Sequence, residues 1–105
     1  MISTVTPQTL LLSLQRALLG EVHPQLRQAS IHADGLGRVV HIRFEYDGHP
    51  SDIVREICSS AATEVIADFP GTWNLDEQHV SIPAPAKLSP LVHIAYRRAE
   101  PQHVA

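Results

Sequence analysis

The sequence predicts an α+β fold: a two-layer α/β sandwich in which a four-stranded, mainly antiparallel sheet carries two helices on one face. Three observations lead to this prediction. Apolar residues recur at helical spacing in two segments, they alternate with polar residues in strand-like segments, and the alternating segments leave one face polar. The expected element order is helix, strand, strand, helix, strand, strand.

The first helix is expected over residues 7–19. Thr6 is a suitable N-cap and Pro7 loses no hydrogen bond at the first helical position, whereas Gly20 suits the left-handed conformation that closes a helix. Leucine and alanine side chains form a broad apolar stripe, with Leu12 and Leu19 on its flank. So many leucines on one short helix indicate either a wide core contact or a partner.

A β-hairpin is expected over residues 25–46, with its turn at residues 34–37, where glycines would supply positive φ angles. A two-residue loop at 35–36 would pair Ile31 with Val40 and keep the apolar residues of both strands on one face. We expect solvent to cover the opposite face, which carries Gln28, Ser30, His32, His41, Arg43 and Glu45.

The second helix is expected to begin at Asp52, because Ser51 can cap it, and to end before Pro70-Gly71. Its apolar side is formed by Val54, Ile57, Cys58, Ala61, Val65 and Phe69, which keep helical spacing.

Two further strands are expected over residues 72–82 and 91–97, joined by a proline-rich extended loop. Trp73 and Leu75 are out of phase with the apolar residues near the end of the first of these strands, which indicates a bulge or short turn at residues 76–78. The apolar side of the final strand is expected to carry Val92, Ile94 and Tyr96.

Size and composition limit the functional classes. The chain has 105 residues, 44% hydrophobic and 18% charged, which fits one domain over residues 1–98 with a flexible tail over residues 99–105. A net charge of −3 argues against a protein that coats nucleic acid. The single cysteine excludes an internal disulfide and a cysteine-rich zinc site.

Seven histidines make a metal site the first chemistry to consider, but their spacing does not favour one. No two of them lie four residues apart on a helix. In the expected hairpin register His41 faces Ser30, so His32 lies only diagonally from it. We therefore expect solvated histidines, no bound metal and no cofactor.

Catalysis is not expected either. Cys58 falls on the apolar side of the second helix, which is typical of a buried and inert thiol. Ser59 and Ser60 lie in mid-helix without a glycine elbow, and no glycine-rich loop precedes a helix to hold phosphate. A small hydrolase that uses a carboxylate or a histidine, such as Asp47 or His41, is kept as a minor alternative.

The remaining candidate is a protein-binding surface. Carboxylates around the second helix and in the strand after it could meet a basic partner, and the candidate contact residues are Asp47, Asp52, Glu56, Asp76 and Glu77. We expect no membrane and no direct nucleic-acid contact. The alternative is a homodimer or larger homo-oligomer, formed through the leucine-rich first helix, with a structural or regulatory role.

Four segments together resemble one group of bacterial proteins. They are residues 15–20 (QRALLG) with the following Pro24 and Leu26-Arg27, residues 44–48 (FEYDG), residues 62–70 (ATEVIADFP) and the final 91–97 (LVHIAYR). This pattern, spread over residues 10–98, is similar to short immunity proteins described as colicin-like or as belonging to contact-dependent growth inhibition.

The resemblance implies a non-enzymatic inhibitor that binds a cognate toxin domain and blocks its active site or its substrate. Two features of the sequence differ from those expected of an inhibitor that blocks an active site with a strongly acidic surface. The second helix starts Ser51-Asp52-Ile53-Val54 where a more acidic run is expected, and the net charge is only mildly negative. We expect a cytoplasmic protein, because residues 10–19 are interrupted by polar side chains and lack the basic start of a signal peptide.

Overall fold

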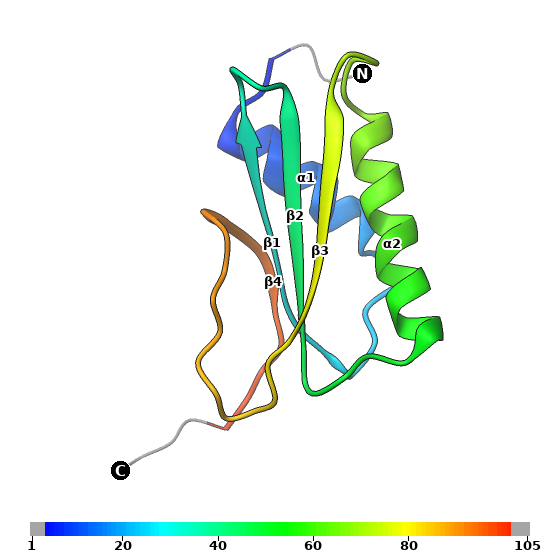
Figure 1. Cartoon of the computed structure of the whole chain (residues 1–105), viewed down its shortest axis with the longest axis vertical. Coiled ribbons are helices and arrows are strands. Elements are labelled where there is room, and N and C mark those ends of the chain that lie inside the picture. The colour runs from blue at the N-terminus through cyan, green and yellow to red at the C-terminus, as the bar shows by residue number, and fades with distance from the viewer. Residues whose placement is uncertain (1–3, 102–105) are drawn as a thin grey trace.

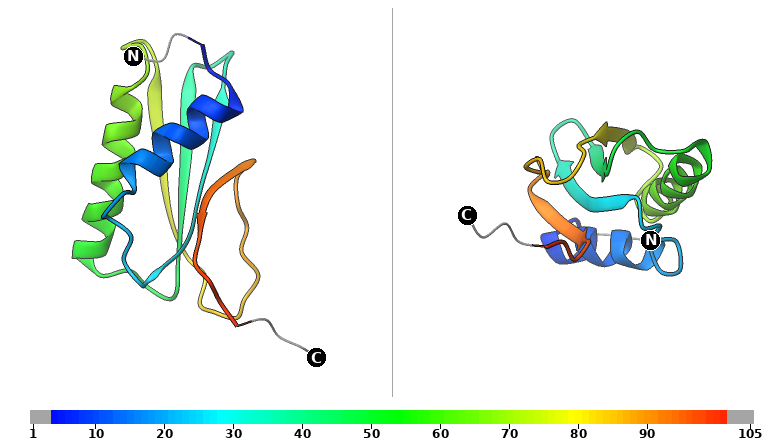
Figure 2. Two further views of the ribbon diagram at one scale, coloured as in Figure 1. Left: turned by 180° about the vertical axis from the view of Figure 1, so that it is seen from behind. Right: turned by 90° about the horizontal axis from the view of Figure 1, so that it is seen from below.

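The computed structural model describes residues 4–101. Along the chain come α1 (Pro7–Ala17), β1 (Leu26–Asp34), β2 (Val39–Tyr46), α2 (Asp52–Ala67), β3 (Asn74–Ser81) and β4 (His93–Arg97). The strands form one sheet in the order β3-β2-β1-β4, and both helices lie on the same face of it (Figures 1 and 2). The fold is therefore α+β, with two layers.

The sheet is mixed. β1 pairs antiparallel with β2 and with β4, whereas β2 and β3 are parallel. This parallel pair follows from α2, which returns the chain to the starting end of β2 before β3 begins (Figure 1). The prediction of a mainly antiparallel sheet holds for two of the three pairings.

Apolar side chains from both helices and from the two central strands form one core. α1 packs over β1 and β4, and α2 packs over β2 and β3. The most deeply buried side chains include Leu14 of α1, Val65 of α2 and Ile31, Ile42 and Phe44 of the sheet. These contacts bury one side of each helix and leave its opposite side exposed to solvent.

Both helices start where the sequence predicts and end earlier. The Thr6 side chain accepts the Thr9 amide in a capping box, and Ser51 accepts the amide of Val54. α1 ends at Ala17, two residues short of the prediction. Gly20 does adopt the left-handed conformation, with φ of 76°.

The hairpin register differs from the prediction by two residues. The turn contains four residues, 35–38, so Ile31 lies opposite Ile42 rather than Val40. The positive φ of the turn, 53°, falls on Arg38 and not on a glycine. A shift by an even number keeps the apolar faces together. It also places His32 directly opposite His41, which corrects the predicted diagonal arrangement.

β3 runs without interruption from Asn74 to Ser81, so the predicted bulge or turn at residues 76–78 is wrong. The apolar pattern is out of phase for a different reason. Glu77 and His79, which lie opposite Ile42 and Phe44 of β2, are polar residues on the helix-covered face.

Residues 82–92, which we call the strap, cross the open face of the sheet to join its two edges. Side chains of the sheet hold the strap backbone: Glu45 accepts the Ser89 amide, Ser30 accepts the Leu91 amide, and Arg27 donates to two strap carbonyls. Gln28, Ser30 and Glu45 are consequently buried, which corrects the prediction that solvent covers this face. Toward the hairpin turn, His32 and His41 stay half-buried.

β4 begins at His93, and of the residues predicted on its apolar side only Tyr96 packs against the core. A bulge between Ala29 and Ser30 shifts its pairing with β1. Ala95 and Tyr96 therefore pack against the core, while Val92 and Ile94 are exposed. Of the expected tail, residues 102–105 lie outside the described residues.

Candidate functional site

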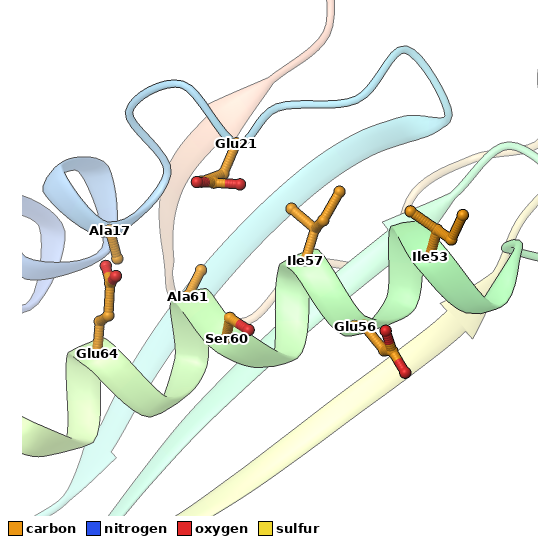
Figure 3. A pocket seen from close by; sticks show the side chains of 8 residues that line it. All are labelled: Ala17, Glu21, Ile53, Glu56, Ile57, Ser60, Ala61 and Glu64. Atoms are coloured by element: carbon orange, nitrogen blue, oxygen red, sulfur yellow. The ribbon is translucent and has the colours of Figure 1, made fainter.

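A groove of about 260 Å³ runs between the outer side of α2 and the segment that follows α1 (Figure 3). Ile57 and Ala61 line it from α2, and Ala17 lines it from the end of α1. Three carboxylates border it: Glu21, Glu56 and Glu64. The groove thus combines an apolar lining with an acidic rim.

The spacing along α2 places these side chains on one side of the helix. They form two rows with a spacing of four residues, which follow the groove in turn: Ile53, Ile57 and Ala61, and beside them Glu56, Ser60 and Glu64 (Figure 3). The adjacent side of α2, with Val54, Cys58 and Val65, is buried against the sheet. Ile53 is left 70% exposed at one end of the groove.

The opposite wall depends on the turn after α1. The amide of Glu21 donates to the Leu18 carbonyl, and Gly20 provides the positive φ that reverses the chain there. The Glu21 side chain consequently points toward α2 (Figure 3).

The carboxylates of the groove differ from the other acids of the protein. Of the eleven Asp and Glu residues, all within residues 4–101, seven have hydrogen-bond or ion-pair partners: Asp34, Glu45, Asp47, Asp68, Asp76, Glu77 and Glu100. Within the same residues, the other four have no side-chain partner: Glu21, Asp52, Glu56 and Glu64. Three of these four border the groove, and Asp52 lies one helical turn before Glu56.

The five predicted contact acids fall into two groups: two stay exposed on α2, and three form hydrogen bonds within the fold. Asp52 and Glu56 lie together on the exposed side of α2, beside Arg55. Asp47 accepts the Ala84 amide and the Arg98 guanidinium, and these two hydrogen bonds lower the pKa of its carboxyl.

Asp76 lies on the open face, where its carboxylate bonds the His41 ring and the Gln78 amide group. These hydrogen bonds lower the pKa of Asp76, the one to His41 most strongly. Glu77 lies on the other face, beneath α2. It accepts from Ser59 and bonds His79, whose second ring nitrogen bonds the Tyr46 hydroxyl. Asp76 and Glu77 thus serve contacts within the fold.

Tyr46 and Cys58 lie at the buried end of this chain of contacts. Burial raises the pKa of the Tyr46 hydroxyl, and burial is also the main cause of the raised pKa of the Cys58 thiol. Both residues are almost fully inaccessible to solvent. The arrangement joins α2 to β3 and offers no opening for a substrate.

Of the residues that line the groove, sequence reasoning singled out only Glu56 as a contact residue, and those it missed include Glu21, Ile53 and Glu64. Ile53 carried a usable signal, because it is an apolar residue that falls outside the apolar stripe of its helix. Glu21 and Glu64 carried none, since they meet only after α1 and α2 have packed together.

Within residues 4–101, no three His, Cys, Asp or Glu side chains converge in positions to hold a metal ion. No helix among these residues has both the length and the apolar character needed to cross a bilayer.

Comparison with known families indicates the class of protein to which this chain belongs. The family model described as MafI2 immunity protein matches residues 7–100. The chain belongs to the MafI2 immunity protein family. No curated protein sequence matches it significantly.

Membership of the MafI2 family supports binding and neutralisation of a cognate toxin. It confirms the predicted class of immunity protein, whereas the narrower likeness to colicin-like and contact-dependent-inhibition proteins stays a prediction.

Proposed function

We propose that this chain is a cytoplasmic immunity protein that holds a basic surface of its cognate toxin against the groove between α1 and α2. The observation that carries this proposal is the distribution of acids: within residues 4–101, the four carboxylates without an internal partner lie in or next to one groove. Carboxylates that remain solvated in the free protein can speed the approach of a basic partner and select for it.

The apolar part of the groove would supply contact area beneath the charges. Ile53 is largely exposed and Ile57 half-exposed, and both lie beside Glu56. Protein interfaces commonly combine a small apolar centre with a charged rim. A lysine or arginine of the toxin could lay its aliphatic stem on the isoleucines and bring its charge to the carboxylates.

The test is co-expression with the toxin encoded beside this chain, followed by measurement of growth rescue and of the Kd of the purified complex. We expect rescue and a stable complex for the natural sequence. The double variant Glu56→Gln, Glu64→Gln should weaken binding about tenfold or more and reduce its dependence on salt.

The matched control changes net charge by the same amount elsewhere. Leu36→Lys and Ala86→Lys, in the exposed hairpin turn and strap, together also add two positive charges and should leave the Kd nearly unchanged. Equal weakening by both pairs would mean that net charge, and not the groove, sets affinity. If neither rescue nor a complex is found, the immunity function itself is wrong.

Homo-oligomerisation through α1 and the turn after it is a second candidate, because Leu12 of α1 and Leu19 of the turn are 55% and 76% exposed. Light scattering at micromolar concentration tests it. A dimer that Leu12→Asp converts to a monomer would support this role, and a strict monomer would remove it.

A further inference from the structure

A small cavity of about 150 Å³ lies beside the groove, where the end of α1 meets the end of α2. Arg16 and Ala17 line it from α1, and Glu64 and Asp68 line it from α2 and its C-cap. Ala17 and Glu64 also line the groove, and the Glu64 side chain extends from α2 toward Ala17 (Figure 3). Arg16 therefore adjoins two carboxylates, of which only Glu64 belongs to the groove.

In the part of the chain that the structure describes, Arg16 pairs with Asp68 rather than with Glu64. Its Nη2 atom lies 3.3 Å from Oδ2 of Asp68. Glu64 and Asp68 are four residues apart, which places them on the same side of the helix, about one turn from each other. The Arg16 side chain is long and 60% exposed, so rotation about its bonds can bring the guanidinium to either acid.

Two features of Asp68 favour its pairing with Arg16. The hydroxyl of the buried Ser13 donates to the same oxygen at 2.6 Å, which fixes the carboxylate in place. Asp68 is also the C-cap of α2, where the carbonyl end of the helix disfavours an unpaired negative charge. Glu64 is exposed and lies one turn earlier, so a pair with Arg16 would have to order two solvated side chains.

We propose that Asp68 is a positioning residue that retains Arg16 and thereby leaves the Glu64 carboxylate open to a basic side chain of the toxin. This role rests on the function proposed above, because Glu64 is one of the acids that border the groove. Without the charge of Asp68, Arg16 turns to Glu64 and competes with the toxin for it. An exposed ion pair is a weak competitor, so the change in affinity is a few-fold.

The experiment measures the Kd of the complex with the cognate toxin for a set of full-length variants. Asp68→Asn keeps an oxygen that can accept from Ser13 and should weaken binding about threefold. Arg16→Gln should not weaken binding, because it removes the competing cation. The double variant Asp68→Asn, Arg16→Gln should recover the Kd of the natural sequence to within about twofold.

The matched control is the double variant Asp68→Asn, Lys87→Gln, which removes an exposed positive charge of the strap instead of Arg16. Its net charge equals that of the first double variant, and it should bind as weakly as Asp68→Asn alone. Recovery by both double variants would mean that net charge, and not Arg16, sets the affinity. That outcome, recovery by neither double variant, or unchanged binding of Asp68→Asn would each overturn the proposal. Circular dichroism of each variant checks that it is folded.

A second readout uses no toxin and separates failure of this proposal from failure of the proposed function. The ¹³C NMR signal of the Glu64 side-chain carboxyl should hardly respond to Arg16→Gln in the natural sequence, and it should move when the same change is made in Asp68→Asn. An equal response in both backgrounds would contradict the role of Asp68. If the natural sequence binds no toxin, the proposed function is wrong, and this spectrum alone decides whether Asp68 keeps Arg16 away from Glu64.

Discussion

The Arg27 side chain, 4% exposed, contacts two other parts of the chain. It donates to the carbonyls of Ile82 and Ala86 and forms a two-pronged pair with Glu100. A buried guanidinium needs this many acceptors, because each unpaired donor away from water costs free energy. One residue of β1 thereby ties the strap and the C-terminal end of the described chain to the sheet.

Low pH should break the ion pair between Arg27 and Glu100. Pairing with Arg27 lowers the pKa of Glu100 to about 2. A carboxyl whose pKa is lower in the folded protein stabilises the fold above its unfolded pKa of about 4.3, and this stabilisation disappears as the pH falls toward 2. We expect the free energy of unfolding, measured with urea, to decrease over that range.

Glu100→Gln separates this contribution from that of the other carboxyls. Near pH 7 it should lower the free energy of unfolding by about 1–3 kcal/mol, because the Arg27 pair loses its charged partner. The variant should also show a shallower loss of stability between pH 5 and 2. An unchanged pH profile would mean that Glu100 does not contribute to acid sensitivity.

At the scale of single elements, α2 shows both the strength and the limit of sequence reasoning. Its cap, its apolar side and its start could be predicted, because helical spacing and capping are local properties. The predicted contact acids were less secure. Whether an acid stays solvated depends on residues far along the chain, as Arg98 for Asp47 and His41 for Asp76 demonstrate.

The cap of α2 offers a direct test. Ser51→Ala removes the side chain that accepts the Val54 amide and should lower the free energy of unfolding by about 1 kcal/mol. Ser60→Ala, in the exposed middle of the same helix, is the matched control and should cost nothing, since alanine is a better helix former. Urea unfolding monitored by circular dichroism measures both, and equal losses would contradict the assigned cap.

At the scale of the whole molecule, the order of strands could not be predicted from alternation. The apolar pattern predicts that a segment is a strand, but it does not identify the neighbouring strand. It also does not fix the length of the hairpin turn, because turns of two and of four residues both keep the apolar side chains on one face. The buried polar residues of the open face depend on the strap, whose path follows from the strand order. The direct pairing of His32 with His41 also escaped prediction, because it depends on whether the hairpin turn has two or four residues.

The strap is held mainly by side chains of the sheet, and most of its own side chains are exposed. It contains Lys87, the only lysine of the sequence. Limited digestion with a lysine-specific protease should therefore cut the native protein before global unfolding occurs. The two fragments should stay associated during gel filtration, since β4 remains paired with β1. Cleavage only at the rate of global unfolding, with mass spectrometry as the readout, would contradict this.

β3 forms one edge of the sheet, and no strand within residues 4–101 pairs with its outer side. Its inward side chains Glu77 and His79 are polar and are bonded to groups beneath α2. A foreign strand that added to this edge would extend the sheet past these polar groups, where an apolar continuation of the core is impossible. The polar groups on its inward side therefore disfavour the addition of a strand from a second copy of the chain at the β3 edge.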